Sequence, residues 1–331
     1  MGGTVLVTGA GGFIGSAVVR MLVRSIRTGG AVFWDGRPLT DVCAVLRPGG
    51  SLERLEEISL DDCWGVERVD MSDCSGLESV LRRRRPRAVL HLAFDPSGVA
   101  GQTEAEQRAR HLASLETVFD GLKGVPQSRV VHTSSAWVLA PGDRLGEGAP
   151  LQPRLEYAKT KLLLDESLPA LHQQTGVPWI NLRLFNVFGR YEDKTRLLPY
   201  LVRCLSRGVP AEVSHGHQIR DFNDVDAIAQ AYRLALQAPE GACCKIFHIG
   251  SARGTTVRKF VDMIADVTGN AHLIQFGAVR PPGDQDIPCL VSDPGRAERE
   301  LGWTPVDDLE QRVHSAAEWW LQRLGLRTGL S

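Results

Sequence analysis

The stretch VLVTGAGGFIGSAVV (residues 5–19) decides the fold, because it joins a predicted strand to a predicted helix through glycines. A short run rich in β-branched residues comes first, and apolar residues at helical spacing follow the glycines. Glycines at such positions permit a tight turn and let backbone N–H groups approach a pyrophosphate at the helix N-terminus. The stretch therefore predicts a dinucleotide-binding turn that contains Gly9, Gly12 and Gly15.

A second strand is predicted over AVFWD (31–35), and it brings an acidic residue about 20 positions after the glycines. Asp35, at the tip of this strand, would bind the ribose diol of NAD and repel the 2′-phosphate of NADP. Arg37 follows shortly after and offers that phosphate a contact. The sequence thus favours NAD as the cofactor and leaves NADP open.

Strands and helices alternate through the first part of the chain, which is typical of an α/β fold with a doubly wound parallel (Rossmann) sheet. Four further strands are predicted, within 65–73, 87–94, 128–136 and 179–185. From these we expect a dinucleotide-binding Rossmann domain over 1–180. Loops rich in Pro, Gly and charge beyond 190 indicate a smaller, mixed substrate-binding lobe over 181–331. The chain is expected to return to the large sheet around 220–250.

Composition excludes several classes of partner. The net charge is −1 and 43% of the residues are hydrophobic, so we expect no nucleic-acid partner and no membrane surface. No apolar run approaches the ~18 residues of a membrane span. The seven cysteines lack the spacing of a metal site and suit reduced thiols, so we expect no metal and a cytoplasmic location.

The stretch EYAKTKLLLDE (156–166) places a phenol and an ammonium one helical turn apart, at Tyr157 and Lys161. Tyrosine is a poor base at its usual pKa of about 10, and a neighbouring ammonium favours the phenolate. Lys159 faces elsewhere on the helix. Taken alone, such a pair is also compatible with a solvated helix face, so its meaning depends on what surrounds it.

The motifs and their order give that context. The glycine turn is followed by TSSA (133–136), by the Tyr–Lys pair and by RLFNVFG (183–189). Near the C-terminus come GHQIRDFNDVDAIAQA (216–231) and VRPPGDQDIPCLVSDPGRAERELGWTP (279–305). This series resembles the extended branch of the short-chain dehydrogenase/reductase superfamily, which acts on nucleotide sugars.

The resemblance implies a role for several residues. Tyr157 would be the acid–base group, Lys161 would also bind the nicotinamide ribose, and Ser135 would orient the substrate oxygen. Further cofactor contacts are implied for Phe13, Ile14, Asp70, Met71, Leu92, Ala93 and Phe185, and substrate contacts for Asn186, Arg220 and Arg280. The partner would be a nucleotide-diphosphate sugar, and the assembly a homodimer.

The chain departs from the family pattern around its predicted site. Ala136 and Trp137 stand where 4,6-dehydratases of the branch carry an Asp–Glu pair, so we expect no dehydratase activity. Leu139 replaces a usual tyrosine, His111 a usual asparagine, and 93–98 a loop of small residues. These departures put the local support of the cofactor in doubt and suggest an unusual substrate.

Two enzymatic functions and one non-enzymatic function remain open. The leading hypothesis is a nucleotide-sugar 4-epimerase that passes through a 4-keto sugar, which the expected NAD preference favours. The alternative is a nucleotide 4-keto-6-deoxysugar 4-ketoreductase using NAD(P)H, which Arg37 and the altered pocket favour. A non-catalytic NAD(P)-binding sensor is opposed by the intact Ser135, Tyr157 and Lys161.

Overall fold

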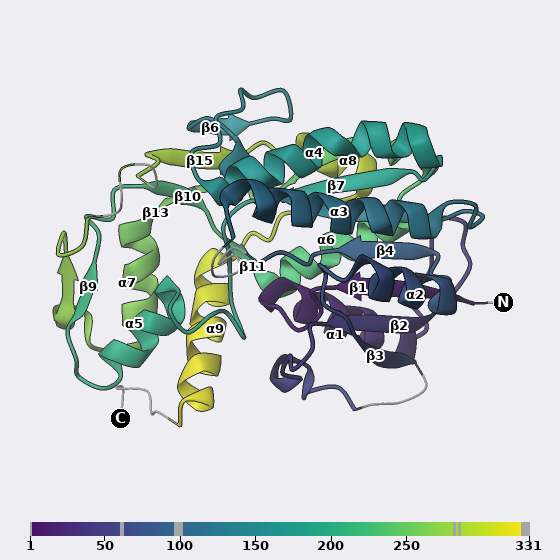
Figure 1. The fold of residues 1–331 in the computed structure, drawn as a ribbon. Coiled ribbons are helices and arrows are strands. Elements are labelled where there is room, and N and C mark those ends of the chain that lie inside the picture. Colours follow the sequence, from purple (N-terminus) through teal and green to yellow (C-terminus); the bar gives the residue numbers. More distant parts are fainter. Residues whose placement is uncertain (1, 60–62, 96–101, 281–282, 284–285, 326–331) are drawn as a thin grey trace.

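A parallel sheet of seven strands forms the centre of the computed structural model, which describes residues 2–59, 63–95, 102–280, 283 and 286–325 (Figure 1). The strand order is β12-β7-β5-β4-β1-β2-β3, and all neighbouring pairs are parallel. The bounds are β1 Gly3–Thr8, β2 Leu39–Leu46, β3 Trp64–Arg68, β4 Ala88–His91, β5 Arg129–Ser135, β7 Trp179–Leu184 and β12 Lys245–Ile249. The predicted doubly wound α/β fold is confirmed.

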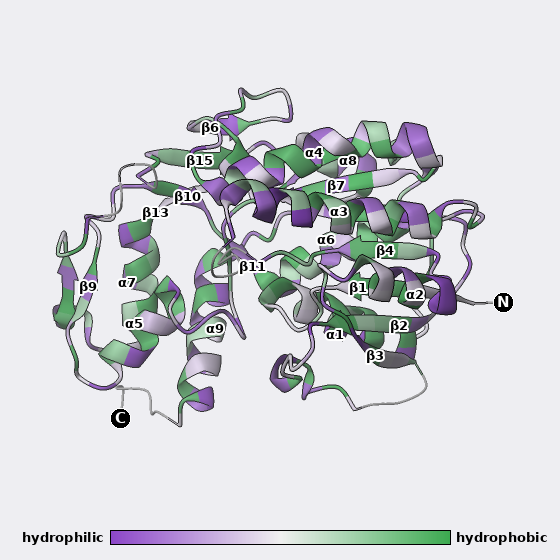
Figure 2. Cartoon of the chain, viewed as in Figure 1, coloured by the Kyte–Doolittle hydropathy of each residue, from purple (hydrophilic) through white to green (hydrophobic). Residues whose placement is uncertain are grey.

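Helices cover both faces of the sheet, which is why its central strands are almost wholly apolar. One face packs against α1 (Phe13–Arg27), α6 (Val225–Gln237) and α8 (Gly295–Leu301). The other packs against α2 (Cys74–Arg84), α3 (Glu104–Leu122) and α4 (Glu156–Thr175). In Figure 2, strand β4 is hydrophobic, whereas the outer turns of α3 and α4 carry hydrophilic residues.

The second strand is not where the sequence predicted it. Residues 31–38 form a short turn instead, in which Val32 bridges Pro38 and Gly36 has a φ of +75°. The Gly36 N–H donates to the Phe33 carbonyl at 3.0 Å, which folds the aromatic run back on itself. The strand itself, β2, starts only at Leu39, because LTDVCAVL supplies the apolar run that the buried sheet requires.

A smaller lobe stands beside the sheet, built around α5 (Leu197–Leu205), α7 (Val257–Thr268) and α9 (Leu309–Arg323) (Figure 1). A mixed sheet in the order β13-β10-β15-β6 accompanies it. Its strands are β13 (Gly254–Thr256), β10 (Ile219–Asp221), β15 (Cys289–Ser292) and β6 (Gly142–Leu145). Short pairs complete the lobe: β9 (Ala211–Val213) with β14 (Ile274–Phe276), and β8 (Val187–Phe188) with β11 (Asn223–Asp224).

Over the described ranges, no helix combines the length and the apolar character that a membrane span needs.

Candidate active site

The glycine turn at the end of β1 forms a cradle that side chains would fill. Gly9 has a φ of +68°, and a Cβ there would lie 2.8 Å from the Ala93 backbone. A Cβ on Gly15 would lie 2.2 Å from the Gly9 carbonyl oxygen. Gly12 caps α1 without a side-chain hydrogen bond, and the first turn, with Phe13 and Ile14, holds no acidic residue. This uncapped helix N-terminus fits an anionic pyrophosphate.

Strand β4 ends beside this cradle. The Thr8 Oγ1 accepts hydrogen bonds from the backbone N–H groups of Leu92 (3.2 Å) and Ala93 (3.1 Å). The same hydroxyl lies 3.1 Å from Nδ1 of His91. Burial lowers the pKa of His91 to about 3, so its imidazole is neutral at physiological pH. His91 is therefore a hydrogen-bonded core residue, and Leu92 and Ala93, for which cofactor contacts are predicted, lie beside the glycine cradle.

Helix α4 brings Tyr157 and Lys161 to the end of β5, where Ser135 lies. The Lys161 side chain is buried, and its Nζ donates to the Thr133 carbonyl at 2.8 Å. Burial lowers the pKa of Lys161 to about 8, against an opposing effect of Asp165. Burial raises the pKa of Tyr157, while a hydrogen bond with the Ser135 side chain lowers it. The three predicted catalytic residues therefore lie together.

Lys159 takes no part in this arrangement. Its side chain is 46% exposed and pairs with Glu156 on the outer face of α4. The distinction between the two lysines made from helical spacing is thus matched by their opposite exposure.

An aromatic contact that the sequence did not predict lies against the Tyr–Lys pair. Phe94 stacks on His111 with ring centroids 4.2 Å apart and an interplanar angle of 5°. Its ring meets the Tyr157 ring edge-on at 5.1 Å, and the Lys161 Nζ lies 4.4 Å from its centroid. Burial lowers the pKa of His111 to about 4, so the stack consists of two neutral rings. The signal in the sequence was Phe94 itself, a large residue in a loop where the family has small ones.

Beneath Lys161, a buried carboxylate organises a second group of polar residues. Asp165 lies one helical turn beyond Lys161 and is 4% exposed. It accepts hydrogen bonds of 2.8 Å each from Ser134, Asn181 and Arg183. This cluster could not be predicted from the sequence, because its members come from α4, β5 and β7.

The predicted substrate residues are only partly brought together. Arg220 on β10 is buried, and its guanidinium carbon lies 5.9 Å from the Trp137 ring centroid, two residues beyond Ser135. Asn186 follows β7, and its carbonyl accepts the Asn223 N–H at 2.7 Å. Arg280 is exposed, and within the described part of the chain no hydrogen bond or ion pair attaches it to the site.

Phe185 belongs to a buried apolar cluster with Ala136, Leu139 and Leu290. It is 2% exposed, and its ring centroid lies 5.5 Å from that of His248. His248 is fully buried, and its Nδ1 lies 2.8 Å from the Leu145 carbonyl, so it is a hydrogen-bonded core histidine. Phe185 therefore packs in the same buried apolar cluster as Leu139.

The cofactor roles predicted for Asp35 and Arg37 are wrong in position. Asp35 accepts hydrogen bonds from Arg87 at 3.2 and 2.8 Å and pairs with Arg37 at 3.4 Å. Hydrogen bonding from Arg87 lowers the pKa of Asp35. Arg87 directly precedes β4, so the trio lies at the amino edge of the sheet. The glycine cradle follows the carboxyl end of β1, six residues or about 20 Å away.

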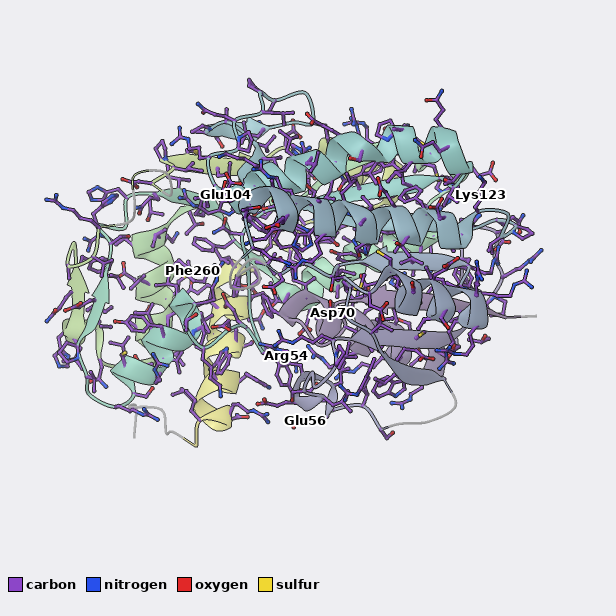
Figure 3. The ribbon with its side chains drawn as sticks, viewed as in Figure 1. Arg54, Glu56, Asp70, Glu104, Lys123 and Phe260 are labelled. Carbon is purple, nitrogen blue, oxygen red and sulfur yellow. The ribbon has the colours of Figure 1, made fainter. Side chains whose placement is uncertain are left out.

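Asp70 and Met71, for which cofactor contacts are predicted, follow β3 at the carboxyl edge of the sheet. Oδ1 of Asp70 accepts from the backbone N–H (2.8 Å) and hydroxyl (2.7 Å) of Ser72, and these bonds lower the pKa of Asp70. Arg54 donates to the Gly11 carbonyl at 3.1 Å and so holds the glycine loop. Figure 3 shows Asp70 and Arg54 on the side of the sheet domain that faces the smaller lobe.

No cluster of three or more residues able to ligate a metal ion occurs among the residues that the structure describes. The site therefore consists of a glycine cradle, a hydroxyl–phenol–ammonium set and a buried arginine. A parallel doubly wound sheet with these groups at its carboxyl edge defines the class of short-chain dehydrogenases/reductases.

Comparison with known proteins gives the family. Residues 5–250 match the NAD dependent epimerase/dehydratase family, and the chain belongs to this family of extended short-chain dehydrogenase/reductase enzymes. It is 29% identical to a dTDP-glucose 4,6-dehydratase of Neisseria meningitidis, covering 96% of this chain and 93% of the relative. It is 27% identical to a UDP-glucose 4-epimerase of Corynebacterium glutamicum, covering 94% of each chain.

Among solved structures, a dTDP-glucose 4,6-dehydratase of Streptomyces venezuelae with NAD and TYD bound superposes with a TM-score of 0.83. It is 25% identical and matches 97% of this chain and 98% of its own. A UDP-glucose 4-epimerase of Thermotoga maritima with UDP-glucose has a TM-score of 0.81 at 23% identity and supports the fold alone.

Proposed function

We propose that this enzyme oxidises or reduces a ring position of a nucleotide-diphosphate sugar, and that it acts foremost as an NAD-dependent 4-epimerase. The observation that carries the proposal is the contact of Ser135 with Tyr157 beside the buried Lys161. Relatives named as epimerases and as 4,6-dehydratases support a sugar nucleotide as substrate. Ala136 and Trp137 argue against the dehydratase, since neither can move the proton that elimination of water requires.

The residues of the chain divide the proton chemistry among them. A bound nicotinamide dinucleotide would supply the hydride acceptor, held at the cradle of Gly9, Gly12 and Gly15. In its phenolate form, Tyr157 would accept the proton of the sugar hydroxyl, and it would return this proton in the second half-reaction. Ser135 would orient the same oxygen. Burial raises the pKa of Tyr157. The positive charge of Lys161 would favour the phenolate and so act in the opposite direction.

Arg220 is the best placed group for the diphosphate. Its guanidinium is buried near Trp137, at the same end of β5 as Ser135. Burial lowers its pKa, yet the group stays charged because arginine starts far above physiological pH. A buried guanidinium offers the bidentate hydrogen bonds that a diphosphate accepts.

A 4-ketoreductase is the second candidate, and the position of Asp35 favours it. The argument for retained NAD depended on Asp35, which lies at the opposite edge of the sheet. Without that carboxylate at the ribose site, the sequence no longer favours NAD over NADP, and the preference for the epimerase is supported by the relatives named as epimerases. Leu139, buried where the family has tyrosine, also removes a polar group from this region.

The catalytic assignment is tested with UDP-glucose and dTDP-glucose and with the matching 4-keto sugar nucleotides. Tyr157→Phe and Lys161→Ala should abolish turnover, whereas the matched Lys159→Ala should keep it, because Lys159 is on the solvent face. Cofactor binding by Tyr157→Phe should remain near wild type. Retained turnover by Tyr157→Phe would overturn the assignment.

The two candidate functions differ in what becomes of the cofactor. An epimerase returns the hydride, so purified protein should release stoichiometric NAD on denaturation and interconvert 4-epimers without added cofactor. A reductase should consume one NAD(P)H per 4-keto sugar. Measuring both on the same preparation decides between them.

A further inference from the structure

Arg47 occupies the position next to the cofactor cradle that the sequence assigned to Asp35. In the sheet register Thr8 pairs with Val45, so Arg47 is level with the glycine loop that follows Thr8. The Ala10 N–H donates to the Val45 carbonyl at 3.2 Å, which joins the loop to the end of β2. The first side chain beyond β2 is therefore a guanidinium, where a carboxylate would favour the unphosphorylated ribose of NAD.

The turn after β2, RPGGS (47–51), is held against the cradle by several contacts. A Cβ on Gly11 would lie 3.3 Å from the Leu46 side chain and 3.5 Å from the Ser51 carbonyl oxygen. The Gly50 N–H donates to the Arg47 carbonyl at 2.9 Å, and Gly49 has a φ of +70°. The Gly50 carbonyl accepts from Arg68 at 2.9 Å. The turn thus has a fixed place beside the glycine loop.

The charge of Arg47 is available to a ligand. Its side chain is exposed, and among the described residues it forms no hydrogen bond or ion pair. Its positive charge is one of the influences that lower the pKa of Asp70, after the two Ser72 hydrogen bonds and Arg110. Asp70 therefore interacts electrostatically with Arg47 but forms no ion pair with it.

We propose that Arg47 accommodates the 2′-phosphate of the adenosine ribose, so that this enzyme accepts NADP(H) in addition to NAD(H). The proposal rests on the proposed function only in assuming that the cradle binds a nicotinamide dinucleotide. A guanidinium matches a phosphate in charge and in hydrogen-bond geometry, and the exposed position lets it meet the ligand without a buried, unpaired charge in the free enzyme. Use of NADPH as an exchangeable cofactor would suit the 4-ketoreductase hypothesis.

The test compares equilibrium binding of NADPH and NADH by fluorescence titration, in the absence of any sugar nucleotide. Wild-type protein should bind both. Arg47→Asp should weaken NADPH binding by about 10- to 100-fold, the value of a charge-assisted contact, and change NADH binding by less than about threefold. Arg47→Ala provides a milder second variant. The matched control is Arg82→Asp, the same charge change at a side chain that is 75% exposed near the C-terminus of α2.

The outcomes separate this proposal from the proposed function. If wild-type protein fails to bind NADPH, or if Arg47→Asp and Arg47→Ala weaken NADPH and NADH equally, the phosphate assignment is overturned. An equal loss of NADPH affinity in Arg82→Asp would trace the effect to the net charge of the protein and would also overturn the phosphate assignment. If no sugar nucleotide is turned over, the proposed function is wrong. The ratio of NADPH to NADH affinity would still test the role of Arg47.

Discussion

Replacing Asp165 by asparagine should remove a large part of the stability of this enzyme. The side chains of Asp165 and Arg183, taken alone, are each 2% exposed, and the carboxylate and guanidinium lie 2.8 Å apart. Ser134 and Asn181 donate to the same carboxylate at 2.8 Å. Asparagine keeps the shape but loses the charge. Its NH₂ group would also face groups that are themselves hydrogen-bond donors. The Arg183 guanidinium would then be buried without a counter-charge.

The expected cost follows from that geometry. Breaking a buried ion pair by removing one partner costs about 3–5 kcal/mol. A chain of 331 residues has an unfolding entropy of roughly 0.7 kcal/mol per kelvin near its transition, at about 2.1 cal/mol/K per residue. The melting temperature should therefore fall by about 4–7 °C.

The same change should alter the pH dependence of turnover. Burial lowers the pKa of Lys161 to about 8, and the negative charge of Asp165 acts against that lowering. Without this charge the pKa of Lys161 should fall further, so the cation that favours the Tyr157 phenolate is lost at lower pH. The alkaline limb of kcat/KM should shift toward neutrality. A variant that only perturbs folding would lower the activity without moving this limb.

The assay is urea unfolding and thermal melting of the wild type, Asp165→Asn and the matched control Glu166→Gln. Glu166 is the exposed neighbour on the same helix and should change stability by less than about 0.5 kcal/mol. Arg183→Met tests the other partner, and the double variant Asp165→Leu/Arg183→Met should recover much of the loss. A cost below about 1 kcal/mol for Asp165→Asn, or one equal to that of Glu166→Gln, would refute the reasoning.

Three further changes probe other parts of the molecule. Asp221 is fully buried and accepts backbone and side-chain hydrogen bonds from Ser251 and Ser292, so Asp221→Ala should cost about 3 kcal/mol or more in urea unfolding, and a near-neutral result would contradict this. Burial raises the pKa of Glu192 to about 7, above its unfolded value, so the folded state gains stability at low pH and loses it as the pH rises through 7. Glu192→Gln should therefore gain about 2–3 kcal/mol relative to wild type between pH 5 and pH 8, measured by urea unfolding at both pH values, whereas a constant difference would exclude this titration. Phe94→Ala removes the ring from Lys161 and, if the nicotinamide ribose binds this lysine, should tighten NADH binding by about 2- to 30-fold in a fluorescence titration, with weaker binding as the contrary result.

The fold could be predicted because short stretches of the sequence indicate its individual strands and helices. Strands buried on both faces must be apolar along their length, and the glycine turn fixes the first strand–helix unit. The error at 31–35 arose because aromatic and β-branched residues favour a strand wherever they occur. The Asp35–Gly36 pair is also a turn signal, and the structure follows the turn. The longer apolar run after it, ending at Leu46, was the stronger evidence for the strand.

The candidate site was predictable where one helix or one turn carries it. Tyr157 and Lys161 are neighbours by helical spacing, and Ser135 ends the preceding strand. Asp165 could not be assigned, because its partners belong to strands distant in the sequence. Arg47 had a usable signal, since it is the first residue after an apolar run of strand length, but misplacing the strand concealed it.

Much of the unexpected structure surrounds the charge of Lys161. Its ammonium is buried, and a buried ammonium is stable only with compensation. Three groups from separate parts of the sequence stabilise the ammonium: the Thr133 carbonyl, the Asp165 carboxylate and the Phe94 ring. Phe94 adjoins Ala93, whose backbone lies against Gly9 of the glycine cradle. If the nicotinamide ribose binds Lys161 as predicted, it competes with the Phe94 ring for this ammonium, so we expect the departure from the family at Phe94 to have its largest effect on cofactor binding at Lys161.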